Sequence, residues 1–303
     1  MRILVLIAAT AFVFLIGVVS RSRNEAPKLT SSHTPRALTM DLANTLKHYG
    51  IDYELREVMK LGGKSIQGIT VKSSDEALVV WGKLRPLFET THRWPIIVGG
   101  DTEIGYRHEF YSPDEEHRNE RDGASWFEYA RSPQYWEDRF RPVIEAYKER
   151  GMEIPSFMTK QRQPVKREDP GQAPAKGNPR RAFNADFQDA NGPVTIALLP
   201  IEHSWQAADY LGFGNFNSCP RASVHSAIHK HWAEQYGAEP VIITHDTIEM
   251  WIERPPMTWK AAFELAEDQL LYAEFDQTGG DLNSPRGLAT SLLGAKTWYF
   301  WWD

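Results

Sequence analysis

Two apolar stretches, Thr195-Ile-Ala-Leu-Leu-Pro200 and Trp298-Tyr-Phe-Trp-Trp-Asp303, decide the predicted fold of the last third of the chain. The first has the length and composition of a buried strand. The second closes the sequence, and five of its six residues are aromatic. A solvated tail would be polar, so we predict that this end also forms a buried strand.

The region between these stretches predicts two helices and a hairpin. A helix over residues 220–236 is followed by strands at 240–244 and 247–253, and a second helix begins after Pro255-Pro256. The resulting order, βαββαβ, is that of the ferredoxin-like pattern. We therefore predict an α+β fold with a ferredoxin-like C-terminal domain over residues 194–303.

A smaller α/β unit is predicted over residues 37–156. Its apolar spacing predicts helices at 38–49 and 74–87 and strands at 53–59, 65–71 and 94–98. The last of these strands ends at Gly99-Gly100, which lacks the other residues of a phosphate-binding loop. The highly polar residues that follow, 101–122, predict no element.

Residues 157–193 form a basic, proline-rich linker between the two units. Their composition cannot build a core, so this stretch marks a domain boundary. We expect the linker to be solvated. The alternative is that its basic side chains rest against the acidic C-terminal domain or against lipid.

The N-terminus carries a hydrophobic segment. The run from Ile3 to Val19 has 17 residues without a charge, and residues 1–23 predict a membrane anchor or a signal segment, followed by a tether over 24–36. We favour an uncleaved anchor helix, because Arg21 directly after the run is unfavourable for cleavage. The side of the membrane stays open, and secretion is the alternative.

The composition limits the class of partner. The chain of 303 residues is 42% hydrophobic and 24% charged, which is typical of a globular protein, and its net charge of −6 argues against nucleic acid as a general partner. We expect an unknown protein or peptide partner, in addition to the membrane. A single cysteine, Cys219, excludes an internal disulfide.

Two histidines give the clearest candidate for a metal site. His225 and His229 are four residues apart on the predicted helix, so their rings share one face. His203, His245 and Asp246 would have to supply further ligands from loops and turns. No glutamate base accompanies the pair, so we expect no metal and no cofactor. The simpler interpretation is that these histidines pack against aromatic side chains.

Cys219 offers a nucleophile beside the same helix. The start of a helix lowers the pKa of a thiol, and His225 or His229 would act as the base. The preceding loop, residues 205–216, is rich in aromatic residues and either lines a binding groove or covers a sheet edge. The candidate binding surface comprises Trp205, Tyr210, Phe213, Asn217, His225 and His229.

The C-terminal region carries a set of motifs that resembles one bacterial family. The motifs that carry the resemblance are Ala197-Leu-Leu-Pro200, Tyr210-Leu-Gly-Phe-Gly214, Cys219-Pro220, Tyr236-Gly-Ala-Glu-Pro240, Pro255-Pro256 and Trp298-Tyr-Phe-Trp-Trp-Asp303. These motifs occur in the same order and at ordinary spacing in the bacterial family called domain of unknown function 4253, which this region therefore resembles. That family implies no established activity and no catalytic residue.

We therefore expect a non-catalytic binding or interaction module held at a membrane, with a role in inter-bacterial conflict or envelope biology. This biological role is inferred only by analogy with the predicted type of fold. The alternative is a metal-dependent or cysteine hydrolase that uses His225, His229 and Cys219. Convergence of these side chains in one concave pocket would favour the hydrolase.

Overall fold

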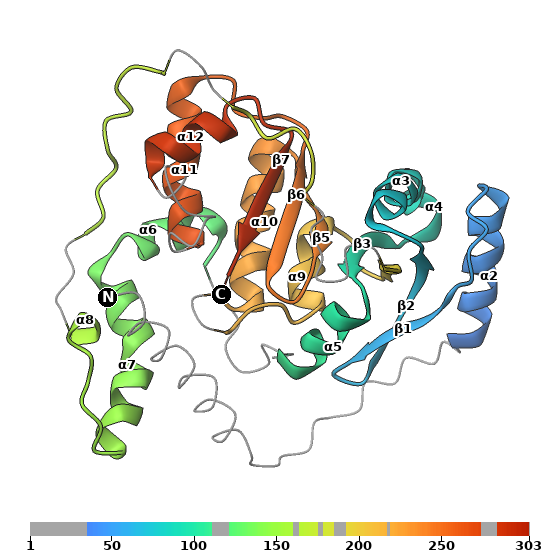
Figure 1. The fold of residues 1–303 in the computed structure, drawn as a ribbon, viewed down its shortest axis with the longest axis horizontal. Helices are drawn as coiled ribbons and strands as arrows, with labels where there is room; N and C mark the ends of the chain where they lie inside the picture. Colours follow the sequence, from blue (N-terminus) through green and yellow to red (C-terminus); the bar gives the residue numbers. More distant parts are fainter. Residues whose placement is uncertain are drawn as a thin grey trace.

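Within the residues that the structure describes (35–110, 121–159, 164–174, 178–184, 192–216, 219–273 and 284–302), the chain forms one seven-stranded mixed sheet, seen in a computed structural model (Figure 1). The strands along the chain are β1 (Arg56–Leu61), β2 (Lys64–Val71), β3 (Trp94–Gly99), β4 (Val194–Leu199), β5 (Ala238–Ile243), β6 (Thr247–Ile252) and β7 (Thr297–Trp301). Their order in space is β1-β2-β4-β3-β5-β6-β7. All neighbouring pairs are antiparallel except β3 and β5, which are parallel.

The helices connect these strands and flank the sheet. They are α2 (Pro35–His48), α3 (Ser74–Leu84), α4 (Phe88–Thr91), α5 (Asp101–Phe110), α6 (Gly123–Ala130), α7 (Pro133–Glu149), α8 (Ser156–Thr159), α9 (Ala207–Tyr210), α10 (Ala222–Tyr236), α11 (Trp259–Tyr272) and α12 (Pro285–Leu292). Local sequence sets many of their ends. Ser73 and Thr258 accept backbone N–H groups at the starts of α3 and α11, and Gly237 ends α10 in the left-handed conformation.

The sheet has a hydrophobic core on each face. On one face, the helices α6, α9, α10, α11 and α12 pack against the strands, and Trp232, Trp298 and Trp302 are fully buried there. On the other face, α2 and α3 cover the sheet through residues such as Leu46 and Val80. Because strand side chains alternate, Ile96 and Ile97 of β3 belong to opposite cores.

The predicted α+β class is confirmed, whereas the predicted ferredoxin-like sheet differs from what is observed. The order βαββαβ does occur along the C-terminal part of the chain. However, β3 from the N-terminal part lies between β4 and β5, so the four C-terminal strands do not form a contiguous sheet. The reason is long-range pairing: β3 forms an antiparallel ladder with β4 in which Ile96 faces Ala197.

The predicted anchor and tether, residues 1–34, lie outside the described residues. Among the helices of the described part of the chain, none is long and apolar enough to cross a membrane. The membrane attachment through Ile3 to Val19 therefore stays a prediction.

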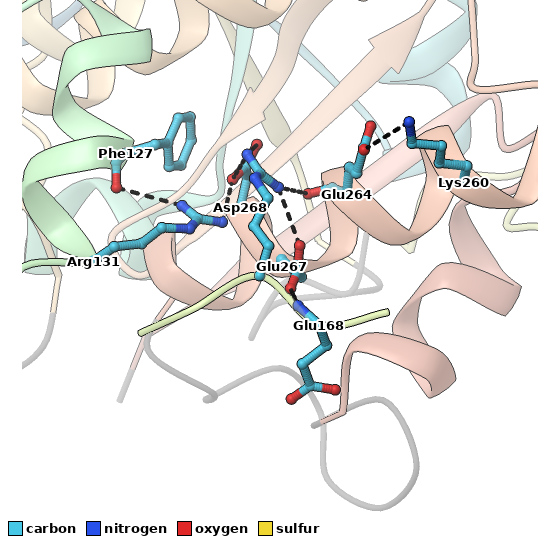
Figure 2. A network of polar contacts seen from close by, with 8 residues as sticks. Phe127, Arg131, Glu168, Lys260, Glu264, Glu267 and Asp268 are labelled. Carbon is cyan, nitrogen blue, oxygen red and sulfur yellow. Dashed lines mark hydrogen bonds and ion pairs between the residues drawn. The ribbon is translucent and has the colours of Figure 1, made fainter. Parts of the chain in front are cut away.

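Two segments of the basic linker, residues 164–174 and 178–184, dock onto the C-terminal part of the molecule; together we call them the strap. Arg167 forms ion pairs with Glu267 (3.1 Å) and Asp268 (3.2 Å) of α11, and Figure 2 shows this network. Arg131, which follows α6, contacts the same Asp268 at 2.8 Å. Asp268 thus joins α6, the strap and α11.

Hydrogen bonds to its backbone hold the strap further along its course. The indole of Trp259 donates to the carbonyl of Pro170 (2.8 Å), and the amide of Asn178 donates to the carbonyl of Thr290 in α12 (3.0 Å). The described part of the linker is thus fastened at these points, although most of its residues are exposed to solvent. The alternative expectation, contact with the acidic C-terminal part, is confirmed for Arg167.

Candidate metal centre

The candidate site lies where the two parallel strands end. β3 ends at Gly99, and α5 begins two residues later with Asp101; β5 ends at Ile243 and turns through His245 and Asp246 into β6. In open sheets, ligands bind in the crevice outside the carboxyl ends of such strands. This junction is the only parallel pair in the described sheet.

Three side chains with metal-ligating atoms meet at this junction. Glu103, on the first turn of α5, forms a hydrogen bond through Oε2 to Nδ1 of His245. On the other side of the ring, Nε2 of His245 lies 3.5 Å from Oδ2 of Asp246. One donor atom from each of the three residues lies within 4.8 Å of the other two. To bind one ion at about 2.0–2.2 Å, Glu103 and Asp246 would have to converge on the same ring nitrogen of His245, so the ring or one carboxylate would have to turn.

Neighbouring strands fix the carboxylate of Asp246. Its Oδ1 accepts hydrogen bonds from the hydroxyls of Thr244 and Thr247, both at 3.0 Å, and its Oδ2 accepts one from the indole of Trp301 at 2.9 Å. Carboxylates that hold metals are commonly oriented by such outer hydrogen bonds. Trp301, in the aromatic C-terminal stretch, thus orients the candidate ligand.

A buried arginine anchors the turn that carries the ligands. Arg107 lies one helical turn after Glu103 on α5 and is 3% exposed. Its guanidinium donates to the carbonyls of Ile243 and Thr244 at the end of β5. Burial lowers the pKa of Arg107 to about 10, with an opposing effect from Glu103, so the group remains charged at neutral pH. The helix α5 is therefore joined to the β5–β6 turn by two side chains, Glu103 and Arg107.

The charges of the site suit a cation. Burial acts to lower the pKa of His245, but its hydrogen bond to the carboxylate of Glu103 and the negative charge of Asp246 outweigh burial and raise the pKa above its ordinary value. When the imidazole of His245 is neutral, the carboxylates of Glu103 and Asp246 and the guanidinium of Arg107 give the site a net charge of −1. A divalent ion would supply the positive charge that a proton on His245 supplies otherwise.

Gly99 allows Glu103 to reach this position. Its φ is +87°, and a Cβ there would lie 2.4 Å from Cγ of Glu103. Only glycine combines this backbone conformation with so close an approach.

Residues 195–303 match the family model described as Domain of unknown function (DUF4253). The C-terminal part of the chain is a DUF4253 domain. The predicted resemblance is thus confirmed. No curated protein and no solved structure gave a significant match to the chain. His245 and Asp246 belong to the DUF4253 domain, while Glu103 and Arg107 precede it, so the site is shared between the two parts of the chain.

The predicted histidine pair lies elsewhere in the DUF4253 domain, inside its core. His225 and His229 on α10 are both 0% exposed, and each forms a hydrogen bond to the hydroxyl of Tyr272 on α11. The thiol of Cys219 lies 3.3 Å from Nε2 of His225. Within the described residues this group is buried, with Cys219 only 5% exposed, and His245 and Asp246 do not belong to it. The packing role considered for the histidines is the one observed.

Electrostatics agree with this role. Burial, followed by the neighbouring His229, lowers the pKa of His225 well below its ordinary value, and burial lowers that of His229 to about 3. Burial likewise raises the pKa of Tyr272. All three groups are therefore neutral at pH 7.

The predicted binding surface is not one surface. Phe213, His225 and His229 are buried in the aromatic core, where the ring of Phe213 meets that of Trp302. Trp205 and Tyr210 are partly exposed, and Asn217 lies outside the described residues. Where it is described, the aromatic loop packs largely into the core on one face of the sheet.

Sequence reasoning named His245 and Asp246 as possible ligands but missed Glu103 and Arg107. Both lie in a polar stretch without an apolar period, so α5 gave no helical signal. The available signal was Gly99-Gly100 directly after an apolar strand, followed by Glu103 and Arg107 at helical spacing.

Proposed function

We propose that the chain binds a divalent metal ion through Glu103, His245 and Asp246. The observation that supports this most is the approach of their three donor atoms within 4.8 Å at the carboxyl ends of β3 and β5. On binding, the hydrogen bond between Glu103 and His245 would be exchanged for two bonds to the ion. Three protein ligands leave a position for water, as in catalytic metal sites.

The ligand types favour particular ions. Imidazole suits Zn²⁺ and Fe²⁺, whereas carboxylate oxygens also suit Mn²⁺ and Mg²⁺. A mixed set of one nitrogen and two oxygens therefore favours Zn²⁺ or Mn²⁺ over Mg²⁺. The proposed site keeps His245 and Asp246 from the alternative ligand set considered from the sequence, with Glu103 in place of His225 and His229.

Calorimetric titration of the chelator-treated protein with Zn²⁺, Mn²⁺ and Mg²⁺ separately tests the proposal. We expect one Zn²⁺ or Mn²⁺ per chain, with affinity at least tenfold lower in Glu103→Gln and in His245→Ala. Asp101→Asn is the matched control, because Asp101 is an exposed carboxylate in the first turn of the same helix. Absence of binding at millimolar ion, or equal affinity in all variants, would refute the proposal.

The expected membrane-held interaction module, with a protein or peptide partner, stays a prediction beside this proposal. Its setting depends on the segment from Ile3 to Val19 and is independent of the metal site. Separation of cell membranes from soluble protein, with detection of the full chain in each fraction, tests it.

A further inference from the structure

The sheet consists of two groups of antiparallel strands, which are joined by a single parallel pairing. β1, β2, β4 and β3 form the first set, and β5, β6 and β7 form the second. The parallel contact between β3 and β5, which we call the seam, has one register pair, Ile97 with Ile242. By contrast, β3 and β4 share five pairs. Parallel pairing is also slightly less stable per residue, so the backbone pairing of the sheet is weakest at the seam, where the two hydrophobic cores continue across it.

Side chains fasten the seam at both ends. At the amino end of β5, the guanidinium of Arg85 contacts both carboxylate oxygens of Glu239, at 2.6 and 2.7 Å. At the carboxyl end, Glu103 contacts His245, and Arg107 binds the last carbonyls of β5. The candidate ligands therefore come from opposite sides: Glu103 follows β3, while His245 and Asp246 follow β5.

We propose that the bound metal ion acts as a clamp across the seam, so that its binding holds the two halves of the sheet together. This inference rests on the proposed metal site. An ion ligated from both sides must be released before β3 and β5 can separate, so it binds the closed form and not the open one. Metal availability would then regulate the opening of the sheet.

Hydrogen exchange of the full chain, followed by mass spectrometry, tests the clamp with the ion that binds in the calorimetric titration. Peptides that cover β3 and β5 report the seam, and those that cover the β1–β2 hairpin serve as the internal control. At free metal 100 times its dissociation constant, we expect exchange at the seam to slow by about 100-fold. Exchange at the hairpin should not change.

Two variants sharpen this test. In Glu103→Gln, the metal-dependent slowing should vanish. In Glu239→Gln, which loosens the other end, exchange at the seam should be faster without metal and should still slow when metal is added. If metal binds but the seam exchanges at the same rate, or if the seam and the hairpin slow equally, the clamp is wrong. Failure to bind at all is seen separately in the titration and refutes the proposed function instead.

Discussion

Two glycines beside Glu103 provide a matched pair of variants. Gly99→Ala should lower the free energy of unfolding by about 1–2 kcal/mol, because alanine is strained at φ +87° and its Cβ would displace Glu103. Its metal affinity should fall as well. Gly105→Ala, within α5, meets nothing within 4 Å and should raise stability by about 0.5–1 kcal/mol. Urea denaturation measures both; equal stability of the two variants would contradict this account of Gly99.

The buried histidines predict a dependence of stability on pH. In the unfolded chain, His225 and His229 take up protons near pH 6.5, whereas in the folded protein their pKa values are lowered, to about 3 for His229. The unfolded state thus binds more protons in this window, so stability is full above about pH 7 and is lost as the pH falls. Each histidine contributes a slope of about 1.4 kcal/mol per pH unit.

Denaturation of the parent and of His229→Leu between pH 5 and 8 checks this. The slope below pH 6 attributed to the pair should fall by about half in the variant. Between pH 7 and 8, both proteins should show no slope from these rings, which provides the internal control. An unchanged slope at low pH would mean that His229 is not the buried neutral group described here.

The attachment of the strap to α11 gives a prediction for whole elements. Arg131 and Asp268 have side chains only 10% and 15% exposed, so Arg131→Met leaves a buried carboxylate poorly paired and should cost about 3–5 kcal/mol. Arg167 pairs with the same carboxylate, but its side chain is 42% exposed. Arg167 also pairs with Glu267, whose side chain is only 8% exposed, so Arg167→Met should cost about 1–3 kcal/mol, less than Arg131→Met. Chemical denaturation measures the free energy of unfolding of both variants. A larger loss of stability in Arg167→Met than in Arg131→Met would show that Arg131 is not the main partner of Asp268.

Most individual elements were predictable, because their signals are local. The apolar run of β3, the glycine turn between β1 and β2 and the left-handed Gly237 after α10 all depend on neighbouring residues. The helix α5 was not predictable from apolar spacing, since the buried residues among its described side chains are the charged Glu103 and Arg107. Charged side chains become buried only when distant groups pair with them, here the β5–β6 turn.

At the scale of the whole molecule, the order of strands was beyond reach of the sequence pattern. Nothing near Trp94 or Val194 indicates that these strands lie side by side, because both are simply apolar. The same insertion brings Glu103 to His245. Of the candidate ligands, only His245 and Asp246, which belong to the DUF4253 domain, could therefore be predicted from the sequence.

The inserted strand predicts that the DUF4253 domain depends on the rest of the chain. A fragment of residues 192–303 lacks β3, so β4 and β5 would each expose an unpaired edge and apolar side chains. We expect this fragment to aggregate or to melt without cooperativity. Co-expression with residues 35–159 should restore a soluble complex with a cooperative melt, measured by circular dichroism. A cooperative melt of the fragment alone would contradict this dependence.

The position of β3 in the sheet also has a consequence for synthesis on the ribosome. Its antiparallel partner β4 begins roughly 95 residues after β3 ends, and its parallel partner β5 follows later still. At about 5–20 residues per second, β3 waits roughly 5–20 seconds before β4 has been translated. During that interval β3 lacks both neighbouring strands, and we expect its exposed isoleucines to bind chaperones that act during translation.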